Sequence, residues 1–139
     1  MTASAFSPDT AIEQLKQVRM GLLRLHKALL DAEKITYEQA NGRIANNMEF
    51  FGLVLNHEWF QWLRPMSGLI AEVDEAVGNK KSPITADIAV RYLEQVTQLV
   101  AVHPTDKGNA LKYYEAIERD PNVAQLHVTL TQILQGETD

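Results

Sequence analysis

Cysteine is absent from this chain of 139 residues, and so are long apolar runs. Without cysteine there can be no disulfide, thiolate zinc site or cysteine nucleophile, which suits a reducing compartment. No stretch reaches the roughly 18 consecutive apolar residues of a membrane span, and the first residues form neither a basic nor an apolar segment. These absences predict a cytoplasmic protein that neither spans nor enters a membrane.

Basic residues are also scarce. The chain has 13 Lys and Arg against 18 Asp and Glu, a formal net charge of -5, and its one pair of adjacent basic residues is Lys80-Lys81. Nucleic acids and anionic membrane surfaces attract clustered positive charge, so we expect the chain to bind neither. The expected partners are proteins or small molecules.

Strand-like alternation is missing too, and apolar residues recur instead at the three-and-four spacing of helices. The length fits a single domain over residues 1–139. We therefore predict an all-α fold, an antiparallel bundle of about four main helices with breaks marked by prolines.

Serine-proline and aspartate-proline pairs predict where helices begin, because serine and aspartate cap a helix and proline suits its first turn. The first helix is expected to run from Ser7-Pro8 to Asn41-Gly42, about 33 residues. That length leaves a break near residues 34–37 possible. The third helix is expected to start at Ser82-Pro83 or at Thr85, and the last at Asp120-Pro121.

The later helices show their expected buried faces as apolar stripes. In the third helix, which is expected to end before His103-Pro104, the stripe is Ile88, Tyr92, Val96 and Leu99, widened by Ala89, Leu93 and Val100. A shorter segment follows with Leu111, Tyr114 and Ile117 on one side. The last helix presents Val123, Leu126, His127, Leu130, Ile133 and Leu134.

The stretch from residue 48 to residue 63 is apolar on almost every side when it is drawn as a helix. Other helices normally enclose such a helix, so we expect it to be the central element. Proline lacks an amide hydrogen, and we expect a joint or kink at Arg64-Pro65 before a second helical piece. Together the two pieces are expected to form an antiparallel hairpin with the first helix across residues 41–47.

The residue types around that proline define a candidate ligand pocket. Its members are His57, Trp59, Trp62, Arg64 and Asp74, with Ser67 beside them. Tryptophan can stack on a guanidinium and arginine can hold a carboxylate, so the set is able to bind a small anionic ligand. Alternatively, the arginine bonds to carbonyl groups freed by the helix break or pairs with Asp74, and this structural role is the one we favour.

Metal and catalytic motifs are not found. The paired ligands of bundle metal sites do not occur, so we expect no metal and no cofactor; a looser site assembled from His26, His57 and His127 is the alternative. Glu33 lies two helical turns after His26, with Tyr37 one turn further on, which favours a structural polar cluster. No nucleophile is accompanied by a base, and an enzyme is not the expected class.

One segment resembles a known family. The pattern Phe60-x-Trp62-Leu63-Arg64-Pro65-x-Ser67, followed by Leu69-Ile70 and Asp74, together with Asp120-Pro121-x-Val123 and His127, is similar to a family of small bacterial all-helical proteins. The resemblance implies an all-α fold and supplies no catalytic residue.

The sequence leads to one functional expectation and one alternative. We expect a non-enzymatic helical bundle that acts by protein association, most simply as a homodimer, because residues 48–63 are more apolar than one short chain can cover. The alternative is a bundle that binds a small molecule or a metal near Trp59, Trp62, Arg64 and Asp74, with or without enzymatic activity.

Overall fold

The structure, a computed structural model, describes residues 6–103 and 107–136. Within these residues there are six α-helices, one 3-10 helix (η1) and no strand, so the predicted all-α fold is confirmed. The elements in chain order are α1 (Pro8–Asn41), α2 (Asn47–Asn56), η1 (Glu58–Leu63), α3 (Arg64–Gly78), α4 (Ala86–Val100), α5 (Asn109–Arg119) and α6 (Pro121–Leu134). The described part thus has two α-helices more than the four main ones predicted.

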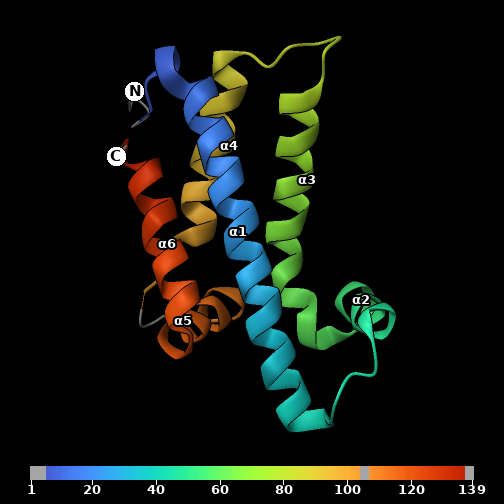
Figure 1. Cartoon of the computed structure of the whole chain (residues 1–139). Helices are drawn as coiled ribbons and strands as arrows, with labels where there is room; N and C mark the ends of the chain where they lie inside the picture. The colour runs from blue at the N-terminus through green and yellow to red at the C-terminus, as the bar shows by residue number, and fades with distance from the viewer. Residues whose placement is uncertain (1–5, 104–106, 137–139) are drawn as a thin grey trace.

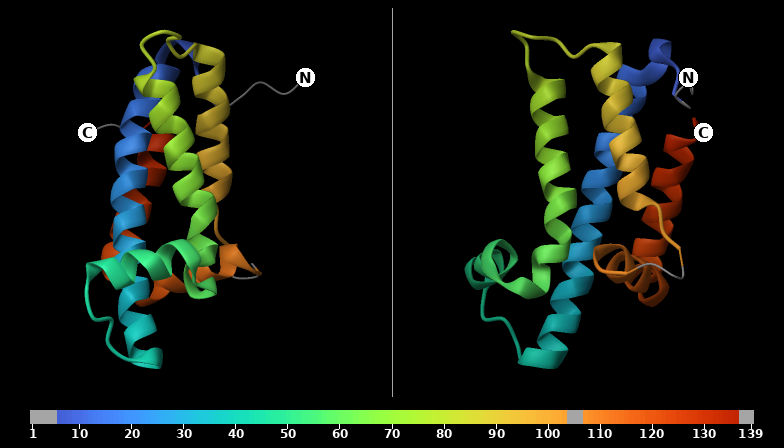
Figure 2. Two further views of the ribbon diagram at one scale, coloured as in Figure 1. Left: turned by 90° about the vertical axis from the view of Figure 1, so that its right-hand side faces the viewer. Right: turned by 180° about the vertical axis from the view of Figure 1, so that it is seen from behind.

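The four longest helices, α1, α3, α4 and α6, lie alongside one another and alternate in direction (Figure 1). The short helix α5 lies at one end of this group, and α2 lies across its long axis (Figure 2). None of the helices in the described ranges has both the length and the apolar composition required to span a membrane.

Helix α1 is the central element of the fold. It contacts α3, α4 and α6, and it is continuous over 34 residues, without the break considered near residues 34–37. It ends at Asn41 and is capped by Gly42, whose positive φ of 94° suits glycine and whose N–H donates to the Glu38 carbonyl. Its buried residues follow the predicted spacing: Ala11, Leu15, Val18, Leu22, Leu25, Ala28, Leu29, Ala32 and Glu33.

The helix starts agree with the predicted positions, although the Ser7 side chain makes no capping hydrogen bond, and one choice is resolved. Pro8 and Pro121 occupy the first turns of α1 and α6, and Asp120 accepts hydrogen bonds from the backbone N–H groups of Asn122 and Val123. For α4 the cap is Thr85, whose hydroxyl accepts from the Ile88 N–H at 3.3 Å. The true cap therefore lies three positions after Ser82.

The expected central helix over residues 48–63 is wrong in two respects. The chain becomes extended at His57 and divides the stretch into α2 and η1, and α2 has no buried residue. Phe60, Trp62 and Leu63 of η1 enter the core instead. The joint at Arg64-Pro65 is present, since η1 changes to α3 there, so only α3 runs back along α1 (Figure 1).

Two buried faces differ from the predicted ones. In α4 the buried residues are Ala89, Leu93, Val96 and Val100, while Ile88 is exposed. In α5 they are Tyr113 and Ala116, and the predicted Leu111, Tyr114 and Ile117 are only half-buried. Both helices have apolar stripes wider than the face that a neighbour can cover, so neighbouring helices decide which edge of the stripe is buried.

Polar side chains on α1 connect it to its neighbours. Gln14 Nε2 donates to the Ile133 carbonyl at 2.9 Å, near the end of α6, where this carbonyl also accepts from the Gly136 N–H at 3.0 Å. Arg19 forms an ion pair with Asp74 of α3.

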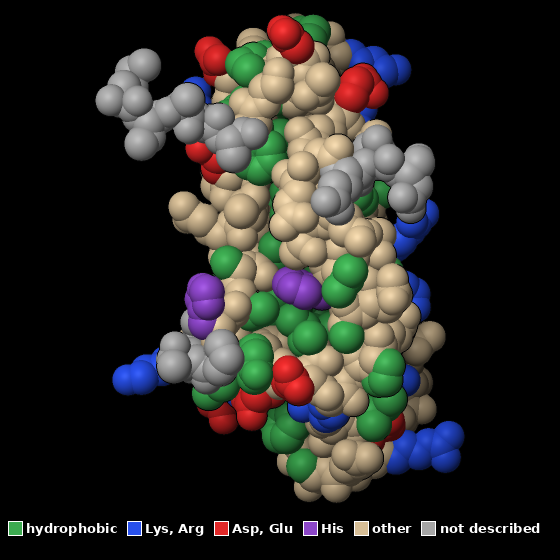
Figure 3. All heavy atoms as spheres, turned by 90° about the vertical axis from the view of Figure 1, so that its left-hand side faces the viewer, with side chains coloured by type: hydrophobic (Ala, Val, Ile, Leu, Met, Phe, Trp, Pro, Cys, Tyr) green, Lys and Arg blue, Asp and Glu red, His purple; other side chains and the backbone are tan. Residues whose placement is uncertain are grey.

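Figure 3 views the molecule from the α6 side, where charged side chains lie mainly at the edges of the face and few lie at its centre.

Candidate functional site

Trp59 and Trp62 line a cavity between α1, η1 and α5, called the tryptophan cavity below. Its volume is about 540 Å³, within the range of small-molecule sites. Trp62 is buried, whereas Trp59 is half-buried and packs edge-on against the ring of Tyr37 with centroids 5.5 Å apart. The complete lining is Glu33, Thr36, Glu58, Trp59, Gln61, Trp62, Lys112, Glu115 and Arg119.

An ion pair forms part of the wall of the tryptophan cavity. Arg119 Nη2 of α5 donates to Glu33 Oε1 of α1 at 2.9 Å. The Glu33 side chain is 10% exposed and that of Arg119 is 44% exposed, so the carboxylate is shielded while the guanidinium reaches solvent. The pair connects residues 86 positions apart, and nothing in the sequence around Arg119 indicates it.

The other predicted pocket residues lie elsewhere. Arg64 donates from Nη2 to the Leu55 carbonyl at the end of α2, and Asp74 pairs with Arg19 rather than with Arg64. A carbonyl at the end of a helix lacks an intrahelical partner, and the one that Arg64 bonds belongs to the break at His57 rather than to the expected break at Pro65. The structure therefore brings Trp59 and Trp62 together and separates Arg64 and Asp74 from them.

Arg64 also lines a second cavity, of about 400 Å³, beneath the end of α2. His26 and Ser67 are on its wall, and the other lining residues are Val54, Leu55, Phe60, Leu63 and Gly68. Burial lowers the pKa of His26, because desolvation disfavours the charged imidazolium. A neutral histidine in mostly apolar surroundings is typical of a packing residue.

Two of the three histidines considered for a metal site have separate local partners, and the third, His26, lines the cavity beneath α2. His57 Nδ1 accepts from the Trp59 N–H at 3.0 Å, and the His57 ring packs against Tyr37. His127 Nδ1 lies 2.6 Å from the Tyr113 hydroxyl. Over residues 6–103 and 107–136, no three His, Asp or Glu side chains form a group that could hold a metal ion.

The Tyr113–His127 pair joins α5 to α6. Desolvation raises the pKa of Tyr113 and lowers the pKa of His127, so both side chains are neutral near pH 7. In the neutral pair one group donates a single hydrogen bond to the other, either the Tyr113 hydroxyl to Nδ1 of His127 or Nδ1–H to the hydroxyl oxygen. This contact accounts for the histidine in the apolar stripe of α6 as a structural residue.

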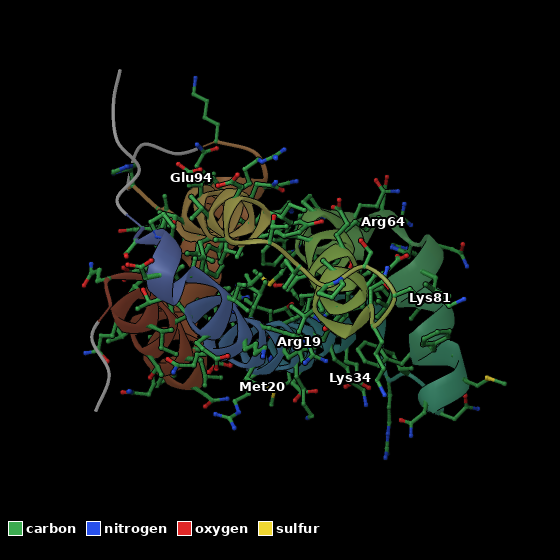
Figure 4. The ribbon with its side chains drawn as sticks, turned by 90° about the horizontal axis from the view of Figure 1, so that it is seen from above. Arg19, Met20, Lys34, Arg64, Lys81 and Glu94 are labelled. Carbon is green, nitrogen blue, oxygen red and sulfur yellow. The ribbon has the colours of Figure 1, made fainter. Side chains whose placement is uncertain are left out.

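Helix α2 carries more exposed large apolar side chains than any other described helix. Three of its side chains, Met48, Phe51 and Leu55, are 81%, 61% and 52% exposed, and seen from above the helix stands outside the four long helices (Figure 4). With Gly52 they follow the spacing of one helical face, and we call these four residues the α2 stripe. They belong to the stretch from which the sequence predicted self-association.

The local structure explains why α2 forms despite lacking cover. Asn46 Oδ1 accepts from the Glu49 N–H at 2.8 Å, and Glu49 Oε2 accepts from the Ala45 N–H at 3.0 Å. This reciprocal cap satisfies N–H groups at the helix start. On the inner side, Phe50 packs edge-on against Phe60, which fastens the helix to the core by one face.

Comparisons with protein-family models, with curated proteins and with solved structures find no match to this chain.

Proposed function

We propose that this protein acts by association and that a second copy of the chain covers the α2 stripe. The exposed apolar face of α2 is the observation that supports this. Three of the seven large apolar side chains exposed on the described residues belong to this one ten-residue helix. Exposed apolar side chains that are contiguous, rather than scattered, are typical of interaction sites.

The chemistry of α2 suits pairing with itself. Its one charged residue, Glu49, is engaged in the helix cap, so two stripes can meet without bringing like charges into contact. A twofold dimer requires a self-complementary patch, and an uncharged stripe of Met, Phe, Gly and Leu meets that condition.

Gly52 gives independent support. Glycine in a helix interior costs about 0.8–1 kcal/mol relative to alanine. A Cβ atom at Gly52 would meet nothing within 4 Å, so packing inside the chain does not require the glycine. At the middle of the stripe it allows the backbone of a second α2 helix to approach closely.

The size of the stripe predicts a weak dimer. A ten-residue helix is about 15 Å long, and one face of it is smaller than the roughly 800 Å² that each partner buries in a stable interface. We expect a dissociation constant of about 10–100 µM. The absence of cysteine and the resemblance to bacterial helical proteins support a role in the bacterial cytoplasm.

Sedimentation equilibrium from about 5 to 500 µM, which brackets the expected constant, tests the proposal. We expect Met48→Glu and Phe51→Glu to abolish the concentration-dependent dimer. Met20→Glu is the matched control, because Met20 is 46% exposed on α1, away from α2 (Figure 4), and this variant should dimerise like the wild type. Gly52→Ala should stabilise the monomer and weaken the dimer. A monomeric wild type over the whole range, or equal loss in the Met20 variant, contradicts the proposal.

A further inference from the structure

The cavity beneath the end of α2, called the His26 cavity below, has only one charged side chain in its wall. That side chain is Arg64, and none of the lining residues is an aspartate or a glutamate. The chain as a whole is negative, with a formal charge of -5, so the positive wall is a local feature. The charge at this position favours an anion in the cavity over a cation.

Arg64 can hold an anion while it keeps its place in the fold. Its side chain is exposed, and Nη2 donates to the Leu55 carbonyl beside α2 (Figure 4). A guanidinium has five N–H groups, so this one contact leaves others for a ligand. Among the described residues no carboxylate pairs with Arg64. Its fork of N–H groups matches a carboxylate, which can accept two parallel hydrogen bonds.

His26 of α1 supplies a second polar group. Its side chain is half-buried at the cavity wall, and its ring nitrogens have no hydrogen-bond partner among the described residues. Burial lowers the pKa of His26, so near pH 7 the ring is neutral and has one N–H donor. His57 and His127, in contrast, each have a partner within the chain. An apolar side chain would serve packing at this position equally well, whereas the unpaired N–H suits an acceptor in the cavity.

A glycine in the same wall is not explained by packing within the chain. Gly68 lies inside α3, where glycine is less favourable than alanine. A Cβ atom there would meet nothing within 4 Å, so the space beside it is open. The apolar wall that a ligand can reach is formed by Val54 and Leu55, because Phe60 and Leu63 are buried.

We propose that the His26 cavity binds a small monocarboxylate with an apolar tail. The carboxylate accepts from the guanidinium of Arg64 and from the N–H of His26, and the tail packs on Val54 and Leu55 in the space beside Gly68. The volume of about 400 Å³ is within the range of small-molecule sites. The site goes beyond the proposed self-association and shares with it only Leu55, so binding is tested on the monomer.

Three probes separate the charge of the ligand from its tail. 4-Methylpentanoate has both, 4-methylpentanamide has nearly the same shape without the charge, and acetate has the charge without the tail. Ligand-observed NMR with about 5 µM protein measures binding below the expected dimer constant, so the outcome does not depend on self-association. At pH 7 and constant ionic strength we expect 4-methylpentanoate to bind with a dissociation constant of about 1 mM, and the other two at least about tenfold more weakly.

Variants then assign the contacts. Arg64→Gln should weaken 4-methylpentanoate binding about tenfold and remove the preference for the acid over the amide. His26→Leu removes one neutral N–H and should weaken it about threefold. Gly68→Leu fills the space for the tail, so it should weaken binding by about tenfold while raising the melting temperature, because leucine is the better helix former. Arg91→Gln is the matched control, an exposed arginine on α4 outside the cavity lining, and it should bind like the wild type.

The histidine ring signals in NMR spectra locate the ligand on the wild-type protein. 4-Methylpentanoate should shift the ring signals of His26, which are identified by their loss in His26→Leu, and should leave those of His127 unchanged. Circular dichroism melts establish that each variant is folded before its binding is compared. If a variant does not fold, the three probes and the ring signals of the wild type still decide.

The inference is overturned if 4-methylpentanoate shows no saturable binding up to about 50 mM, well above the expected constant. It is equally overturned if the amide binds as tightly as the acid, if the His26 ring signals do not respond, or if Arg91→Gln weakens binding as much as Arg64→Gln. Unchanged affinity in Gly68→Leu contradicts the position given to the tail.

Discussion

Replacing Arg119 with alanine should destabilise the protein more than replacing its partner Glu33 with glutamine. The two side chains form one ion pair between α1 and α5, but their environments differ. Glu33 is 10% exposed and Arg119 is 44% exposed. Loss of the arginine leaves a shielded carboxylate without its counter-charge, whereas loss of the glutamate charge leaves a guanidinium that water can reach.

The exposures set the expected magnitudes. Breaking a fully buried pair costs about 3–5 kcal/mol, and solvent at Arg119 places this pair below that range, at about 2–3 kcal/mol for Arg119→Ala. Glu33→Gln keeps the side-chain shape and should cost about 1 kcal/mol. For a chain of this length each kcal/mol lowers the melting temperature by about 3–4 °C, so the expected losses are about 6–12 °C and 3–4 °C.

Thermal melts and urea titrations at pH 7 measure both variants and the double variant. The double variant should be less destabilised than the sum of the single ones, because the two residues interact directly. Lys27→Ala is the control, since the Lys27–Asp31 pair is exposed on both sides and should contribute about 0.5 kcal/mol or less.

Equal losses for the two single variants would refute the argument from burial. A loss for Arg119→Ala no larger than that of the Lys27 control would refute the importance of the pair itself.

Two further predictions follow from the site. Arg64→Ala should cost less than about 1 kcal/mol in urea unfolding, because the Leu55 carbonyl that it bonds is at an exposed helix end where water can replace it; a larger loss would show that the contact is buried. Burial lowers the pKa of both His26 and His127, so below the unfolded value near 6.5 the unfolded chain binds more protons than the folded one. The two neutral histidines therefore leave the free energy of unfolding intact above about pH 6.5, and this contribution is lost as the pH falls through the folded pKa values. The melting temperature should fall more steeply below about pH 6.5 in the wild type than in a His26→Gln, His127→Gln double variant. Parallel curves of melting temperature against pH for the two proteins would contradict this prediction.

Several elements could be read from the sequence because their causes are local. Proline at Pro8 and Pro121 suits a first helical turn wherever the helix is placed, and Asp120 caps its own helix within three residues. The stripe of α1 is also local information, since a narrow apolar face of 34 residues allows only one side to be buried. These features specify helices and their limits without any knowledge of neighbours.

The tertiary structure decided which apolar surfaces are covered and which distant side chains meet. Residues 48–63 are apolar on almost every side, so periodicity could not indicate that η1 enters the core while α2 remains outside it. Arg119 reaches Glu33 across 86 residues, and Trp59 and Trp62 share a cavity with α5 rather than with Arg64 and Asp74. Contacts of this kind depend on how whole helices pack, and helical spacing describes each helix only by itself.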